Sequence, residues 1–492
     1  MWTLWPIFII PVLGSIAILI TPMDTESGIN KGKTIGLLTS IVALIESMRL
    51  WMGFDNSTAD FQYIIRLDWL LGGAYNEKIL FGVDGISIFF IVLTGILIPI
   101  CLLASWDSVK ILHKEFLLCI LGIEFLLFGV FTVLDILGFY VLFEGILIPM
   151  FLMIGIWGSR SEKVRASYYF FFYTLVGSVL MLISIFYIYN LTGTTDYLSL
   201  LGWQFDTEVE KLLFLAFFAS LAVKIPKIPF HVWLPQAHVE APVSGSVLLA
   251  GLLIKLGSYG FIRYSLALMP NASQYFAPLV FTLAVLGVIY ASITTLRQTD
   301  LKRIIAYSSI AHMGIVTIGI FTLTVIGIEG SIFLQLSHGL VASALFLIVT
   351  IIYDRHHTRL VKYYRGLAIT MPIYASLFLF FTLANIAVPL SCNFVGELVC
   401  LVSAYEVNST VAILASLGMV LSASYSLFLY NRVSFGSMSP YIAGAAENRD
   451  INRREFYVLL PLVVLALLLG VYPQIIFDSI HASVVNLTKY IQ

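Results

Sequence analysis

Long runs of apolar residues dominate the chain and predict helices that cross a membrane. A bilayer-spanning helix needs about 20 mostly apolar residues, and about 14 segments of the sequence fit that template. Their centres lie near residues 14, 42, 93, 123, 146, 177, 222, 255, 283, 312, 341, 382–402, 418 and 464. We therefore expect an all-α polytopic membrane protein, with one long interrupted segment at 382–402.

The positions of the basic residues support this succession of spans. Of the 27 lysines and arginines, 18 fall in odd-numbered connections, including Lys302 and Arg359, and six, including Arg263, fall in even-numbered connections or the C-terminal tail. The positive-inside rule predicts such a bias. The odd connections should thus face the cytoplasm or mitochondrial matrix, and both termini the opposite side.

Composition excludes most other classes of protein. Hydrophobic residues make up 60% of the chain and charged residues 11%, too few polar groups to cover a water-facing surface. The net charge of −1 gives no reason to expect a nucleic-acid partner. The four cysteines form no CxxC pair and no glycine-rich phosphate motif occurs, so neither a metal or Fe–S site nor a nucleotide site is predicted.

Ionisable residues recur inside the predicted spans. Each costs about 2.5–3.5 kcal/mol to insert at the bilayer centre, so such residues are functional candidates. Buried lysines and glutamates can hold either charge state, and a row of them linked by water can relay protons. The series is Glu124, Glu144, Lys224, Lys255, His312, His338 and Glu397.

Prolines interrupt two of these spans beside a charged residue. Pro226 and Pro229 follow Lys224, and Pro389 precedes Glu397. Proline removes a backbone donor, and irregular backbone at membrane depth is tolerated only where it lines a polar cavity. The two breaks predict inverted five-helix repeats, the arrangement of many ion carriers. We expect three N-terminal helices (1–113), a first repeat (114–268), a second, inverted repeat (274–432) and a C-terminal loop and helix (433–492).

Four stretches of sequence carry a resemblance to a known family. They are AVKIPKIPFHVWLPQAHVEAPVSGSVLLAGLLIKLGSYG (222–260), TTLRQTDLKRIIAYSSIAHMG (294–314), SHGLVASALF (337–346) and NFVGE (393–397). They resemble the antiporter-like subunits of proton-pumping NADH:ubiquinone oxidoreductase, respiratory complex I, along essentially the whole chain. Glu397 places the chain with the group that has glutamate in the broken twelfth helix, where two other groups have lysine.

The resemblance implies a role for each residue of the series in proton transfer. It implies that Glu144 pairs with Lys224, that Lys255 is the central lysine, and that Glu397 is the terminal carboxylate. His312 and His338 match the histidines that bridge the two half-channels, and Glu124 resembles the glutamate of the fourth helix. Lys227 departs from the pattern, because relatives usually have an apolar residue there. Lys227 is, with Glu124, a further candidate for proton transfer. Its charge either disfavours protonation of both Lys224 and Lys227, or its side chain reaches toward the basic surface.

The same resemblance implies a core subunit of an H⁺-translocating NADH:ubiquinone reductase without a redox centre of its own. NADH, FMN, Fe–S clusters and ubiquinone would belong to partner subunits, and the partners would be other membrane-arm chains in a lipid bilayer. The mitochondrial inner membrane is expected, with a bacterial plasma membrane as alternative. An Mrp-type cation/proton antiporter subunit is the alternative function. A purely structural scaffold is disfavoured by the midplane charges.

Overall fold

The computed structural model describes residues 3–68, 78–441 and 449–491, and these residues fall into two compact units. The first unit contains Met1–Ile225, Leu252–Ala277 and Ile476–Gln492. The second contains Pro226–Gly251 and Pro278–Ile475. The chain therefore first passes from one unit to the other after Ile225, which is three residues beyond residue 222, the centre of the predicted seventh span.

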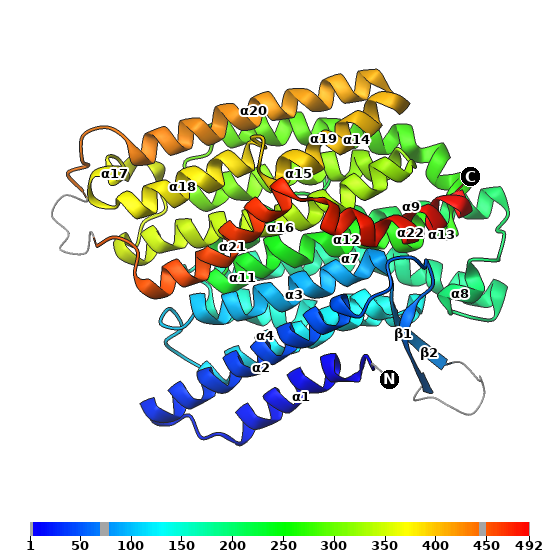
Figure 1. Cartoon of the computed structure of the whole chain (residues 1–492), viewed down its shortest axis with the longest axis horizontal. Helices are drawn as coiled ribbons and strands as arrows, with labels where there is room; N and C mark the ends of the chain where they lie inside the picture. Colours follow the sequence, from blue (N-terminus) through cyan, green and yellow to red (C-terminus); the bar gives the residue numbers. More distant parts are fainter. Residues whose placement is uncertain (1–2, 69–77, 442–448, 492) are drawn as a thin grey trace. The chain divides into compact units, whose positions relative to one another are not determined.

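The first unit is built from helices and one hairpin. Its helices are α1 (Trp5–Ile20), α2 (Glu26–Met52), α3 (Gly85–Ala104), α4 (His113–Thr132), α5 (Ile136–Gly145), α6 (Leu147–Trp157), α7 (Lys163–Thr192), α8 (Tyr197–Leu200), α9 (Thr207–Lys224), α12 (Ile254–Gly260), α13 (Leu266–Leu268) and most of α22 (Gln474–Ile491). The first four long helices α1–α4 lie side by side (Figure 1) and pack against one another.

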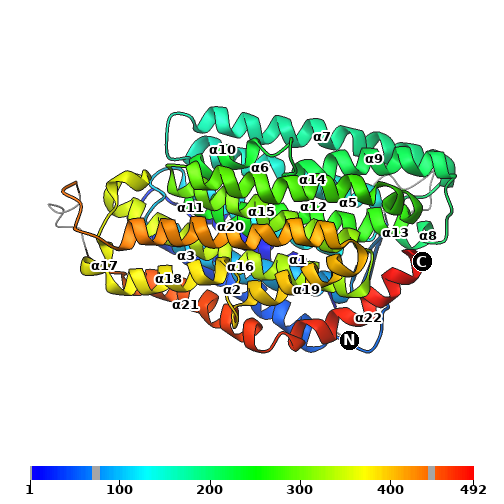
Figure 2. The same cartoon turned by 90° about the horizontal axis from the view of Figure 1, so that it is seen from above.

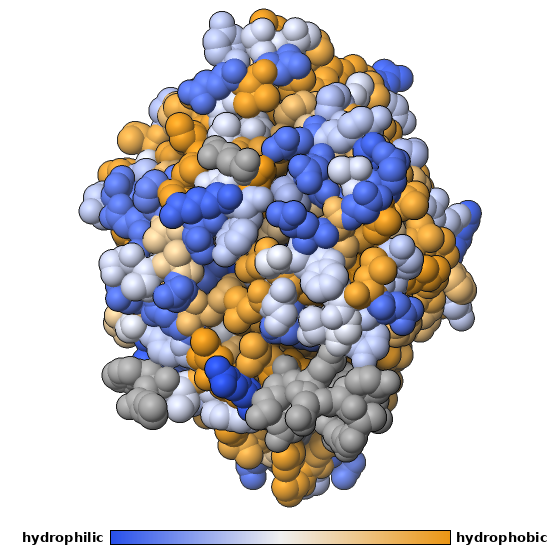
Figure 3. Space-filling model, turned by 90° about the vertical axis from the view of Figure 1, so that its right-hand side faces the viewer, coloured by the Kyte–Doolittle hydropathy of each residue, from blue (hydrophilic) through white to orange (hydrophobic). Residues whose placement is uncertain are grey.

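The hairpin and α22 were not predicted from the sequence. Strands β1 (Gln62–Asp68) and β2 (Lys78–Val83) pair antiparallel and lead directly into α3. Helix α22 packs on the start of α3, where the Ser483 hydroxyl accepts a hydrogen bond of 3.0 Å from the Gly85 N–H. The end of the first unit that carries β1, β2 and α8 shows hydrophilic side chains among apolar ones (Figure 3).

Among its described residues, the second unit is built from helices and their connections, without a named strand. Its helices are α10 (Trp233–Glu240), α11 (Val243–Leu248), α15 (Leu301–Phe321), α16 (Val325–His356), α17 (Leu367–Thr370), α18 (Pro372–Asn385), α19 (Cys392–Val407), α20 (Ser409–Ser434) and α21 (Arg453–Val471). Helix α14 (Pro270–Arg297) begins in the first unit and continues into the second. Helix α16 is buried and packs against α15, α18, α19 and α21. Helices α18 and α20 of the same unit lie side by side (Figure 2).

The helical, membrane-spanning class predicted from the sequence is confirmed. Among the described residues, 11 helical segments are long and apolar enough to cross a membrane, and α1 and α18 are shorter apolar helices. Both predicted interruptions are present: the chain leaves helical geometry between Lys224 and Trp233, and again between Asn385 and Cys392. The number of true crossings and the inverted repeat remain predictions.

Candidate functional site

In the first unit, three of the predicted ionisable residues lie beside helix irregularities. Glu144 is in the last turn of α5, which ends at Gly145. Pro149 in the next helix has no N–H to donate to the Gly145 carbonyl, so the helical hydrogen bonding is interrupted there. Lys224 is the last residue of α9. Lys255 follows a π-helical turn at Leu249–Leu253. Such turns often occur at functional sites, because they leave backbone groups free for other partners.

The ammonium of Lys224 lies in an apolar pocket beside Glu144. Its Nζ sits 4.2 Å from the centre of the Phe143 ring, and the lysine is 4% exposed. A cation over an aromatic face is stabilised by the ring quadrupole, and more strongly where water is excluded. The ring of Phe143, the residue before Glu144, therefore holds the Lys224 ammonium near the Glu144 carboxylate.

Glu144 and Lys224 are close enough to interact electrostatically, as the resemblance implies. Within the described ranges they make no direct ion pair, and both Glu144 oxygens are shielded from solvent, with the Ser178 hydroxyl close to the carboxylate. Charged groups in a poorly solvated site interact strongly even without contact. The protonation state of one group should thus depend on that of the other.

Glycines allow α12 to approach α9 at the level of Lys224. A Cβ on Gly257 would stand 2.8 Å from the Leu221 carbonyl oxygen, 2.6 Å from Ile225 Cγ1 and 3.1 Å from Lys224 Cβ. Helices can pack this closely in a membrane only where a small residue faces the neighbour. The position of the Lys224 backbone is therefore set in part by the absence of a side chain at 257.

We expect Gly257→Ala to destabilise the protein by about 1–3 kcal/mol, the range for overpacking a closely packed site. Gly122→Ala is the matched control, because a Cβ on that helical glycine meets nothing within 4 Å. The measurement is the fraction of detergent-extracted protein that stays folded after graded heating. Equal heat resistance of the two variants would contradict the packing argument.

Two further candidates of the first unit are fully enclosed. Lys255 and Glu124 are both 0% exposed. Neither Glu124 oxygen has a hydrogen-bond partner among the described residues. A buried carboxylate without partners is costly, so Glu124 should hold its proton or interact with internal water.

In the second unit, a histidine and a glutamate form a buried pair. His312 Nδ1 lies 2.6 Å from Glu397 Oε1, and their side chains are 3% and 1% exposed. The His338 ring centre is 5.6 Å from that of His312. Sequence reasoning named all three residues, and the structure brings them together from α15, α16 and α19. A proton shared in this pair can reside on either partner, because imidazole and carboxylate can both accept one.

Small residues bring together α16 and α19, the helices that carry His338 and Glu397. A Cβ on Gly396, next to Glu397, would stand 2.8 Å from Leu334 Cα, and one on Gly330 would stand 2.6 Å from Val399 Cγ1. The side chain of Glu397 is therefore held in the packed interior between α16 and α19.

A small cavity with a mostly apolar lining and a few polar side chains lies one helical turn before His312. It is lined by Ser308 of α15, Thr382 and Asn385 of α18, and Tyr425 and Ser426 of α20, with apolar residues between them. Tyr425 is also close to Glu397. Polar groups inside an apolar bundle favour the presence of water, which is the medium for proton movement between side chains.

Lys227 does not reach the surface, which excludes one of the two readings left open by the sequence. Its side chain is 4% exposed, and its Nζ donates to the Thr317 hydroxyl and, at 3.4 Å, to the Met313 carbonyl. Both partners belong to α15, just beyond His312. Within the described residues, Lys227 has no carboxylate at ion-pair distance.

Sequence reasoning missed one buried ion cluster in each unit, because it treated these residues as connecting-segment charges. In the first unit, Arg263 donates to Asp84, the N-cap of α3, and stacks on Phe61, Tyr197 and Tyr259. These contacts tie the start of the hairpin to α3, α8 and α12. The sequence carries no signal that would have separated Arg263 from exposed loop arginines.

The cluster of the second unit surrounds Arg359, which is 0% exposed. Its guanidinium lies 3.3 Å from Glu240 Oε1 and 3.7 Å from Asp300 Oδ2. Lys302 is also buried and donates to the Ala241 carbonyl at 3.0 Å. The contacts of Arg359 and Lys302 fix the end of α10 and the start of α15. A basic residue near the end of a span therefore need not face water.

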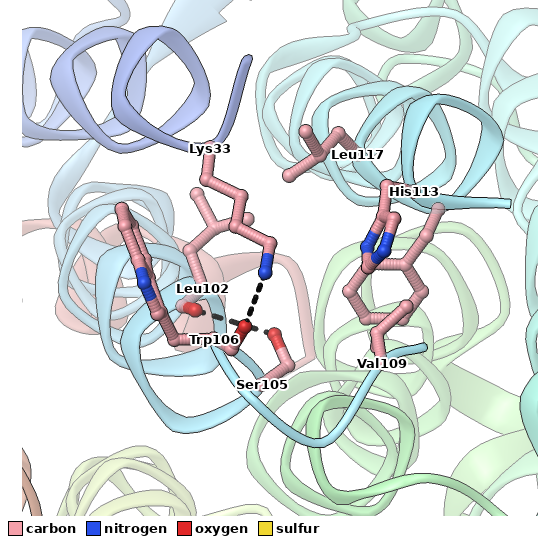
Figure 4. Close-up of a pocket in the computed structure, with 8 residues that line it drawn as sticks. Lys33, Leu102, Ser105, Trp106, Val109, His113 and Leu117 are labelled. Atoms are coloured by element: carbon pink, nitrogen blue, oxygen red, sulfur yellow. Dashed lines mark hydrogen bonds between the residues drawn. The ribbon is translucent and has the colours of Figure 1, made fainter. Parts of the chain in front are cut away.

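A pocket of the first unit lies apart from the residues named above. Figure 4 shows the Lys33 ammonium donating to the Trp106 carbonyl at 2.5 Å, with His113 on the other side of the pocket. Lys33 and Trp106 suit the level of lipid headgroups, where such side chains gather. The pocket contains no carboxylate, and it adds nothing to the proton-transfer series.

Metal chemistry has no support in the described part of the chain. No group of three or more histidine, cysteine, aspartate or glutamate side chains there could hold a metal ion. The described residues instead include single buried acids and bases, three of them beside helix irregularities, and a His–Glu pair, and these groups can accept, hold and release protons.

Comparison with known proteins shows the family of this chain. Residues 133–423 match the family described as NADH:quinone oxidoreductase/Mrp antiporter, transmembrane. The chain is 55% identical over 481 residues to NADH-ubiquinone oxidoreductase chain 4 of Metridium senile, covering 97% of this chain and 96% of the relative. The chain belongs to the NADH:quinone oxidoreductase/Mrp antiporter family.

A second relative is similar in sequence, and two solved structures are similar in fold. The protein named NADH-ubiquinone oxidoreductase chain 4 in Marchantia polymorpha is 51% identical over 484 residues, covering 98% of this chain and 96% of the relative. A chain of respiratory complex I from Thermus thermophilus, solved with bound NADH, superposes with a TM-score of 0.87 at 28% identity over 99% of both chains. A chain of the Mrp complex from Dietzia sp. DQ12-45-1b shares the fold, with a TM-score of 0.83 at 21% identity over 99% and 96% of the two chains.

Proposed function

We propose that this chain is a proton-translocating membrane subunit of NADH:ubiquinone oxidoreductase, respiratory complex I. The observation that carries the proposal is the series of buried acids and bases inside the helices of each unit, in a chain 55% identical to NADH-ubiquinone oxidoreductase chain 4 over nearly its full length. Buried ionisable groups in a membrane mark proton or ion pathways. Redox chemistry, with NADH, FMN, Fe–S clusters and ubiquinone, takes place in partner subunits.

In the first unit, Glu144 and Lys224 form the switch. A charge change in a neighbouring subunit alters their mutual stabilisation, and Lys224 then loses or gains a proton. Lys255 holds the next proton position, and Glu124 is an additional acid on α4. Because Phe143 keeps the Lys224 ammonium beside Glu144, a small shift of either group changes the charge balance.

In the second unit, His312 and Glu397 form the exchange site, with His338 beside them. A proton that reaches the imidazole passes across the 2.6 Å contact to the carboxylate. Water in the cavity lined by Ser308, Asn385 and Tyr425 then connects Glu397 with one side of the membrane. The inverted repeats (114–268 and 274–432) make these two sites counterparts, each beside a broken helix.

The proposed location is the mitochondrial inner membrane, with both termini on the intermembrane-space side. The bias of basic residues toward the odd connections supports this orientation, and the eukaryotic relatives support the compartment. The proposed partners are other membrane-arm subunits of complex I, including other antiporter-like chains.

An Mrp-type cation/proton antiporter subunit is the alternative, favoured by the shared fold of the Dietzia chain and by the family description, which covers both kinds of protein. Gentle solubilisation, affinity isolation of this chain and identification of what accompanies it separate the two. We expect flavin- and Fe–S-containing subunits and inhibitor-sensitive NADH:quinone activity. A small complex without redox subunits, showing cation-dependent proton exchange in vesicles, would contradict the proposal.

A further inference from the structure

Lys227 is a buried base that the mechanism above does not use. It follows Lys224 by three residues in the interruption between α9 and α10, and it belongs to the second unit. Its amine contacts only neutral groups among the described residues, namely the Thr317 hydroxyl and the Met313 carbonyl. Structural lysines in protein interiors normally pair with a carboxylate, because an unpaired ammonium is costly to bury. The surroundings of Lys227 therefore suit an amine that can release its proton.

The partners of Lys227 place it next to the exchange site. Met313 follows His312 directly in α15, and Thr317 lies one turn further. The Thr317 hydroxyl accepts from the lysine and donates to the Gly314 carbonyl at 2.8 Å. A hydroxyl can both accept and donate, so it can pass a proton by reorienting. Lys227 thus has a proton-conducting neighbour on the helix that carries His312.

His312 has one ring nitrogen available for such an exchange. Nδ1 is taken by Glu397, whereas Nε2 is buried and has no hydrogen-bond partner in the described part of the chain. A buried polar atom without a partner requires an explanation, such as internal water or a proton in transit. An imidazole that receives a proton at Nε2 can release another at Nδ1, and the ring then returns to its neutral state.

We propose that Lys227 is an additional proton-transfer residue of this chain, supplying His312 through Thr317 and internal water. In the step, Lys227–NH₃⁺ becomes the neutral amine, His312 Nε2 gains the proton, and Nδ1 delivers a proton to the Glu397 carboxylate. The net charge of the three groups is unchanged. The inference rests on the proposed function, and it adds a proton position that the family resemblance does not assign.

The test compares four forms of the intact complex in proteoliposomes: wild type, Lys227→Met, Lys227→Arg and Lys227→His. Protons pumped per NADH oxidised are measured and normalised to the amount of assembled complex. We expect a fall of at least twofold in Lys227→Met and in Lys227→Arg, because guanidinium keeps its positive charge and does not release a proton. Lys227→His should retain most of the ratio, since imidazole can release a proton.

Thr317→Val provides a second test, because it leaves the lysine in place and removes the hydroxyl. It should lower the ratio as Lys227→Met does. Lys33→Met is the matched control, since Lys33 also donates to a backbone carbonyl, that of Trp106, but lies outside the proton-transfer series (Figure 4); its ratio should equal that of the wild type.

Each outcome decides between the inference and its alternatives. A wild-type ratio of protons pumped per NADH in Lys227→Met would overturn the inference. A wild-type ratio in Lys227→Arg would also overturn it, because it would show that Lys227 contributes only a fixed positive charge. Lys224→Met is measured alongside. If Lys227→Met pumps normally while Lys224→Met does not, only the inference fails. If both pump normally, the proposed function fails as well.

Discussion

Replacing Lys224 with methionine is expected to lower NADH-driven proton pumping by about tenfold or more in complexes that still assemble. A positioned acid or base contributes roughly 10²–10⁴-fold to a proton-transfer step, and methionine fills the same apolar site over Phe143 without an ammonium. Glu144→Ala should have a similar effect, because it removes the carboxylate with which Lys224 interacts. The measurement is the initial rate of vesicle acidification, normalised to assembled complex.

The control for this prediction is Lys211→Met. Lys211 lies in the same helix, α9, but pairs with Glu208 at 2.8 Å on a solvent-accessible surface. Exposed pairs of this type contribute about 0–1 kcal/mol, so we expect normal assembly and pumping. Undiminished pumping in both Lys224→Met and Glu144→Ala would refute the switch assigned to these residues.

The second large effect is expected at the His–Glu pair. Glu397→Gln keeps the shape of the side chain but removes its ability to receive a proton from His312, so pumping should again fall by about tenfold or more. The substitution also removes the charged acceptor of a buried hydrogen bond, and leaving a buried partner without its bond costs about 1–3 kcal/mol. We therefore expect reduced heat resistance of the complex in Glu397→Gln.

A double variant separates these two effects. In His312→Gln/Glu397→Gln neither member can be left charged, so heat resistance should recover relative to Glu397→Gln while pumping stays low. This is the behaviour expected of a coupled pair in a double-mutant cycle. Recovery of pumping together with heat resistance would show that the pair has a structural role only.

The membrane-spanning helices could be predicted because hydrocarbon imposes a length and a composition on them. Both interruptions could also be predicted, since prolines at 226, 229 and 389 cannot continue a hydrogen-bonded helix. The hairpin at residues 62–83 could not, because two short strands in a connecting segment leave no comparable apolar run. Helix α22 has polar residues such as Asp478 and Lys489, so it falls outside the template of a span.

The candidate site was predictable in residue type but not in contacts. Single acids and bases within apolar runs are conspicuous, and the family resemblance supplied their roles. The contact between His312 and Glu397, 85 residues apart, depends on how α15 and α19 pack, which a single sequence does not specify. The burial of Arg263, Lys302 and Arg359 was missed for a related reason: a basic residue near a span end has the same local pattern whether it faces water or a carboxylate.

The most direct test of the account is the ratio of protons pumped to NADH oxidised when Lys255 is replaced by methionine. Lys255 is 0% exposed and follows the π-helical turn of the first unit, so it cannot act through surface charge. The account predicts that assembled Lys255→Met complex oxidises NADH but pumps fewer protons per NADH than the wild type. A wild-type ratio in that assembled variant would contradict proton transfer through this chain and would leave it a structural subunit.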